Sequence, residues 1–91
     1  MQRHPPSYEI LTFENNEVYG NMVVSAENAV DVFLENCMAY VHGAPATRFG
    51  ATEMSVYFSE QGVLDEKRRT VMLIGVLTPA MLQTIRSRLR Q

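Results

Sequence analysis

The chain has 91 residues, enough for one hydrophobic core and too few for two. Hydrophobic residues make up 46% of it and charged residues 20%, a composition that excludes a disordered chain. No apolar run approaches the roughly 20 residues that span a bilayer, and the first residues lack the apolar stretch of a signal peptide. Because Cys37 is the only cysteine, no intramolecular disulfide can form, and we expect a cytoplasmic protein with no membrane contact.

The formal net charge of −2 hides an uneven distribution along the chain. Residues 3–47 contain six acidic residues and one basic residue, which give −5. From Arg48 onward, seven basic residues and four acidic residues give +3. Such an asymmetry either balances between neighbouring faces of one small domain or steers a partner, including a second copy of the chain.

The first predicted element along the chain is an extended strand over residues 8–13. Its alternation puts Tyr8 and Ile10 on one face of a sheet and Leu11 and Phe13 on the other. Both faces are therefore apolar, which is unusual for a strand that has one face in water. We expect cover on both sides of this strand.

A hairpin turn and a returning strand follow. Asn15 and Asn16 are predicted to make the turn, because asparagine tolerates the left-handed conformation that a tight hairpin requires. Residues 18–24 return as the second strand. Within it, Gly20 marks a bulge or a close approach of two backbones.

A helix is predicted next, from Ser25 as N-cap to about His42. Gly43 offers the left-handed residue that often follows a helix, and Pro45 prevents continuation. The apolar stripe that recurs at three- and four-residue intervals consists of Ala26, Ala29, Val30, Phe33, Cys37, Met38 and Val41. The opposite face carries an acidic ridge, expected in solvent, of Glu27, Asp31 and Glu35.

The middle of the chain is predicted to contain a loop over residues 44–50 and then a strand over residues 52–59. The side chains on one face of that strand are expected to be Met54, Val56 and Phe58. An irregular connection follows over residues 60–67, with its turn either at a left-handed Gly62 or near residues 65–67.

The last strand is predicted over residues 69–77, and Thr78 and Pro79 start the final helix as N-cap and first helical residue. The apolar side of this helix consists of Met81, Leu82, Ile85 and Leu89. Three arginines suit the negative end of its dipole: Arg86, Arg88 and Arg90.

The expected fold class is α+β, with element order ββαββα and a four-stranded, mainly antiparallel sheet that packs both helices on one face. Residues 1–7 are predicted to form a loose N-terminal arm and residues 8–91 a single domain. Residues 71–77 are apolar at both odd and even positions, so both faces of this strand also need cover. Because two helices cover only one face, we expect a second subunit, a partner or the N-terminal arm on the other.

The sequence contains no residue pattern that points to a catalytic, cofactor-binding or metal-binding site. The possible metal ligands are His4, Cys37 and His42, and on a helix the last two diverge by about 140°. Cys37 is expected in the core and His42 at a helix end. The sequence contains no nucleophile motif and no glycine-rich phosphate loop. We therefore expect no cofactor and no enzyme activity.

The leading functional hypothesis is a small non-enzymatic protein–protein interaction module, a homodimer that regulates or sequesters a protein partner. The alternative is a nucleic-acid-binding regulator that uses residues 67–69 and the arginine-rich C-terminal helix. On that helix Arg86 and Arg90 share a face while Arg88 points away. The three arginines therefore form no continuous surface for phosphates, and we expect no nucleic-acid binding. A second alternative is a small enzyme or ligand-binding domain with no recognisable motif.

Overall fold

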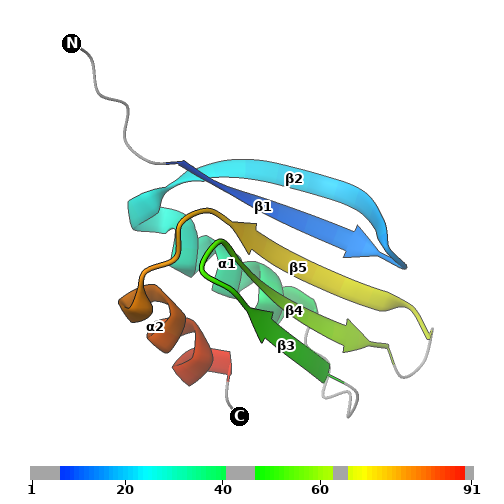
Figure 1. The fold of residues 1–91 in the computed structure, drawn as a ribbon. Helices are drawn as coiled ribbons and strands as arrows, with labels where there is room; N and C mark the ends of the chain where they lie inside the picture. The colour runs from blue at the N-terminus through cyan, green and yellow to red at the C-terminus, as the bar shows by residue number, and fades with distance from the viewer. Residues whose placement is uncertain (1–6, 41–46, 63–65, 90–91) are drawn as a thin grey trace.

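The computed structural model describes residues 7–40, 47–62 and 66–89. In chain order these form β1 (Ser7–Glu14), β2 (Glu17–Ser25), α1 (Ala26–Tyr40), β3 (Thr47–Ala51), β4 (Ser55–Gln61), β5 (Arg68–Ile74) and α2 (Pro79–Leu89). The strands make one antiparallel sheet in the order β2-β1-β5-β4-β3 (Figure 1). Ser7, predicted as the last residue of a loose arm, is the first residue of β1, and the rest of that arm lies outside the described residues.

The predicted α+β class is confirmed, but the predicted number of strands and the order ββαββα are wrong. Five strands are described, in the order ββαβββα. The additional strand, β3, lies in the segment predicted as a loop, and it pairs with β4 from Thr47 opposite Glu60 to Ala51 opposite Val56. Its five residues include Arg48 and Gly50 and lack an alternating apolar pattern. Pairing with a distant strand overrides a weak local preference here.

The first hairpin follows the prediction closely. Asn15 and Asn16 have φ values of 53° and 71°, the left-handed conformation that a two-residue turn needs. The pairing register between β1 and β2 shifts between Thr12 and Phe13, so a bulge interrupts the ladder as expected near Gly20. A Cβ atom at Gly20 would lie 2.7 Å from Oγ1 of Thr12, so a side chain and not a second backbone approaches this glycine closely.

One hydrophobic core fills the space between the sheet and the helices. Helix α1 runs behind the sheet (Figure 1) and contacts β5, β2, β1 and α2. The buried side chains of the core are Tyr8, Ile10, Ala29, Phe33, Leu34, Cys37, Val56, Phe58, Val71, Leu73, Leu77 and Ile85. Because strand residues alternate between faces, the members from β1, β4 and β5 define the side of the sheet that the helices cover.

Helix α1 begins directly after Ser25, as predicted, and Nδ2 of Asn28 donates a hydrogen bond to Oγ of Ser25 at 3.1 Å. Phe33 and Cys37 are fully buried, which confirms the centre of the apolar stripe. The prediction for Met38 is wrong, since this side chain is exposed. At 100° per residue Met38 falls on the side of the acidic ridge. The predicted helix end near His42 lies outside the described residues.

The turn between β3 and β4 corrects the predicted start of the strand at residue 52. Oγ1 of Thr52 accepts hydrogen bonds from the backbone N–H groups of Met54 at 3.1 Å and Ser55 at 3.0 Å. This turn delays the strand to Ser55 and leaves Met54 exposed. Val56 and Phe58 are buried as predicted.

The connection from β4 to β5 is irregular, as expected. Gly62 donates its backbone N–H to the carbonyl of Lys67 at 2.8 Å, and among the described residues of this connection Glu66 is left-handed, with φ of 56°. The second of the two predicted turn positions is therefore correct. Residues 63–65 lie outside the described residues.

Strand β5 ends at Ile74, earlier than predicted, because the chain turns at Gly75 with a φ of 153°. A Cβ atom at Gly75 would overlap the ring of Tyr8, whose hydroxyl donates a hydrogen bond to the carbonyl of Val76. Helix α2 then starts as predicted. The backbone N–H of Met81 donates to Oγ1 of Thr78 at 3.1 Å, and Ile85 is fully buried.

Candidate interaction surface

The face of the sheet opposite the helices, here called the open face, carries an apolar cluster. On this face Leu11 of β1 lies opposite Met72 of β5, and Met72 lies opposite Tyr57 of β4. A row of large side chains thus crosses the three central strands. The open-face cluster consists of Leu11, Phe13, Tyr57, Met72 and Ile74. Each is half-buried, and none belongs to the core between the sheet and the helices.

Tyr57 is held against the sheet by the strand beside it. In the register of β3 and β4, Gly50 lies opposite Tyr57. A Cβ atom at Gly50 would overlap the Tyr57 ring, so the ring lies over the glycine. An aromatic ring over a cross-strand glycine compensates for the missing side chain and extends the apolar surface toward the β3 edge.

Polar groups border the cluster at both ends. At one end, Oγ of Ser59 accepts hydrogen bonds from Oγ1 of Thr70 at 2.9 Å and from a guanidinium nitrogen of Arg68 at 3.2 Å. At the other end, Nδ2 of Asn21 donates to Oε2 of Glu9 at 3.4 Å. An apolar centre with a polar rim is the usual arrangement of a protein–protein interface.

The edge strand β2 exposes further apolar side chains, some of them on the open face. The exposed fractions are 57% for Val18, 54% for Tyr19, 44% for Met22 and 71% for Val23. Val18 lies opposite Phe13 and Val23 opposite Glu9, so both belong to the open face, whereas Met22 lies opposite Ile10 on the helix-covered face. The uncovered apolar surface thus continues from the centre of the sheet to one of its edges.

The only cysteine offers no reactive group. Cys37 is fully buried in the core, and desolvation by burial raises the pKa of its thiol to about 12. The thiol is therefore protonated at neutral pH and behaves as a small hydrophobic group. His4 and His42 lie outside the described residues. Within the described ranges no three His, Cys, Asp or Glu side chains gather as a metal site would require.

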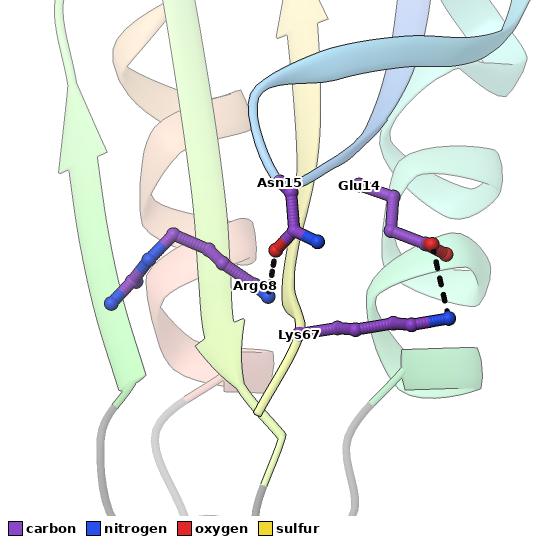
Figure 2. A network of polar contacts seen from close by, with 4 residues as sticks. All are labelled: Glu14, Asn15, Lys67 and Arg68. Atoms are coloured by element: carbon purple, nitrogen blue, oxygen red, sulfur yellow. Dashed lines mark hydrogen bonds and ion pairs between the residues drawn. The ribbon is translucent and has the colours of Figure 1, made fainter. Parts of the chain in front are cut away.

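The basic residues at the start of β5 are tied into the sheet. Figure 2 shows Nζ of Lys67 beside Oε1 of Glu14, at 3.4 Å, and the backbone N–H of Arg68 bonded to Oδ1 of Asn15, at 3.0 Å. The backbone N–H of Asn15 donates in turn to the carbonyl of Arg68 at 2.8 Å. These contacts join the β1–β2 turn to β5. They give the basic cluster predicted for nucleic acid a structural role.

One of the arginines of α2 is engaged by an aromatic ring. The guanidinium carbon of Arg86 lies 5.9 Å from the centre of the Phe49 ring, a cation–π distance. Arg88 is exposed on the same helix, and Arg90 lies outside the described residues. The expected pairing of these arginines with the acidic ridge of α1 stays a prediction, although the exposure of Glu27, Asp31 and Glu35 agrees with a solvated ridge.

Sequence reasoning missed one buried ionisable residue, Glu60, which is only 2% exposed. The prediction placed it in the connection after the strand, whereas it continues the inward alternation of Val56 and Phe58. Its register neighbour on β5 is Arg69, and the neighbour of Arg69 on β1 is Glu14. Acidic and basic residues thus alternate across three strands at this end of the helix-covered face. The alternation Val-x-Phe-x-Glu was the signal that could have located it.

The fold and its surface place the chain among small α+β domains with an antiparallel sheet that is covered on one face. No protein-family model, curated protein or solved structure matches it. None of the helices in the described part of the chain has the length and apolar character to cross a membrane.

Proposed function

We propose that this domain is a non-enzymatic protein–protein interaction module, a homodimer that regulates or sequesters a protein partner. The observation that carries the proposal is the open-face cluster, which the two helices leave uncovered. Burial of apolar surface is worth about 25 cal/mol per Å², so contact with another protein at this face is favourable. A face of this kind is better explained by contact than by exposure to water.

The composition of the cluster supports a protein partner in particular. Phe13, Tyr57 and Met72 belong to the residue types that are enriched in interfaces, and charged residues are absent from the cluster itself. Tyr57 is held in place over Gly50, so little side-chain freedom is lost when it becomes buried. Glu9 and Arg68 lie at the border, where charges add specificity.

The nucleic-acid alternative draws less support from the described contacts. Lys67 lies against Glu14, Arg68 bonds to Ser59, and Arg86 lies over Phe49. A phosphate-binding surface needs several free cations side by side. We therefore keep the expectation that nucleic acid is not bound.

Light scattering over a micromolar concentration series tests the homodimer. We expect a mass of about twice the 10.3 kDa of one chain, which decreases only on strong dilution. A mass that stays at 10.3 kDa throughout the series would contradict the proposal.

A second experiment tests the open face as the partner-binding surface. The bait variant Met72→Lys places a charge at the centre of the cluster, and Thr84→Lys on the exposed side of α2 serves as the matched control. We expect the wild type and the control to capture the same partner, and Met72→Lys to lose it while it still melts cooperatively. Equal capture by all three proteins would reject the open face.

A further inference from the structure

The two edges of the sheet differ in how they meet solvent. Strand β2 forms one edge, with nine residues, four exposed large hydrophobic side chains and one charged residue, Glu17, at its start. It lies along the outer side of β1 (Figure 1). The outer edge of a strand presents backbone N–H and C=O groups, which are a template for a further strand.

The opposite edge, β3, has features that discourage such pairing. It has five residues, and its exposed Arg48 places a charge within the strand. Arg86 of α2 lies over the Phe49 ring, so a helix side chain contacts β3 at this residue. Short edge strands, charges and helix cover are the usual protection of a sheet edge. Strand β3 is short and has a charge in its interior, whereas β2 is longer, carries no charge after Glu17 and is interrupted only by the bulge near Gly20. Strand β2 is therefore the edge better suited to pairing.

We infer that β2 pairs in antiparallel orientation with β2 of a second copy, so that two five-stranded sheets become one continuous sheet. The inference rests on the proposed homodimer and names the strand that forms it. We infer a second copy at this edge because an antiparallel pair of identical strands is two-fold symmetric. The backbone groups of each β2 strand then pair with those of the other, and the assembly closes at two chains. The hairpin with β1 already orders β2, so pairing orders no new segment.

The charges on β2 favour the antiparallel orientation. In that orientation each Glu17 lies toward the uncharged Ser25 end of the other strand, whereas parallel pairing would bring the two Glu17 side chains together. Val18 and Val23 lie on the open face and Met22 on the helix-covered face, so apolar side chains of the two strands would pack beside one another on both faces of the joined sheet. The hydrophobic contact drives this association.

Net charge opposes the same association and therefore makes the dimer affinity depend on salt concentration. Strand β2 belongs to the half of the chain with a charge of −5, so the dimer brings two acidic halves together. Salt screens such repulsion, with a Debye length of about 8 Å at physiological ionic strength. The β2–β2 dimer therefore tightens as salt is added. A head-to-tail contact of β2 with β3 of another copy would instead join an acidic half to a basic half. Added salt would weaken that contact.

The first test is a matched pair of substitutions, Val23→Glu on β2 and Val76→Glu in the loop after β5. The two valines are 71% and 64% exposed, so both variants add one charge at a site the monomer tolerates. For Val23→Glu we expect the dimer dissociation constant in sedimentation velocity to rise about tenfold or more, and for Val76→Glu to stay near the wild-type value. Thermal melting establishes that each variant is folded.

The second test maps the strand by single-cysteine substitution at each residue from 19 to 23, with Val76→Cys as the control. Cys37 stays in place, because its buried, protonated thiol does not react. Identical residues of antiparallel strands meet only at the two-fold axis. Mild oxidation should therefore yield disulfide-linked dimers at one position or two neighbouring positions of β2 and none at the control.

The outcomes separate this inference from the proposal on which it rests. A wild-type chain that stays monomeric overturns the homodimer and β2–β2 pairing together. The same holds if the monomer instead binds an extended peptide along β2. A wild-type dimer that survives Val23→Glu and forms no cross-link in β2 leaves the homodimer standing and overturns β2 pairing. Assemblies that grow beyond two chains and loosen with salt indicate head-to-tail pairing and overturn it as well.

Discussion

At the scale of single residues, near neighbours along the chain set the environment of several side chains. Asn15 and Asn16 adopt left-handed φ because the tight turn requires it, and Cys37 is buried because it lies one helical turn after Phe33. Met38 was wrongly assigned to the apolar stripe of α1 because residue spacing alone does not define where the buried face of a helix ends. Glu60 was missed because its burial depends on a register with Arg69 that no local pattern records.

The buried thiol predicts a dependence of stability on pH. The pKa of Cys37 rises from 9.0 to about 12 on folding, so the unfolded chain ionises first as pH increases. The stability that the neutral thiol contributes is present below pH 9.0 and is lost between pH 9.0 and about 12. Urea unfolding of wild type and Cys37→Ala on both sides of pH 9.0 measures this, and the wild type should lose more stability over the interval. Parallel losses in the two proteins, or rapid native labelling of the thiol, would mean that Cys37 is accessible.

A methyl group at Gly75 should destabilise the fold. The residue has a φ of 153°, which side chains rarely adopt, and an added Cβ atom would meet the ring of Tyr8. For Gly75→Ala we expect a loss on the order of 1–3 kcal/mol in the free energy of unfolding. Val76→Ala is the neighbouring control at an exposed site and should change stability by about 0.5 kcal/mol or less. Equal melting temperatures for both variants would refute the strained contact.

At the scale of elements, local signals were sufficient wherever a segment has its own pattern. The Asn-Asn turn, the helix start at Thr78-Pro79 and the apolar spacing along both helices all predicted the observed elements. Strand β3 was missed because it has five residues and no alternation, so its conformation depends on pairing with β4. Strand β5 was predicted too long because its apolar run continues past the turn at Gly75.

Helix α2 should be required for folding. It contributes the fully buried Ile85, and Met81, Leu82 and Leu89 pack against the same core. Full burial of one such side chain contributes about 1.5–3 kcal/mol, while the net stability of small domains is about 5–15 kcal/mol. We expect a chain truncated after Thr78 to lose its cooperative melting transition in circular dichroism. Substitution of the exposed Gln83 by Ala controls for surface effects. A cooperative transition near the parent temperature would show that β1–β5 and α1 suffice.

At the scale of the whole molecule, the sequence predicted the existence of an uncovered apolar face but not its outline. The two-sided apolar pattern of residues 71–77 and of β1 pointed to a sheet with too much apolar surface for two helices, and Leu11, Phe13, Met72 and Ile74 lie on the open face accordingly. The contribution of Tyr57 and the position of β2 at an edge depend on strand order, which arises from long-range pairing. A surface that spans several strands is visible only once that order is known.

The measurement that tests the central claim most directly is a dilution series of backbone amide NMR spectra of the wild-type chain. If β2 pairs with β2 of a second copy, amides of β2 shift or broaden as concentration rises, while the acidic ridge at Glu27, Asp31 and Glu35 stays unchanged. The account predicts that the changes cluster along residues 17–25 and fade across β1 toward β3. Spectra that do not change with concentration, or changes confined to α1 and α2, would contradict it.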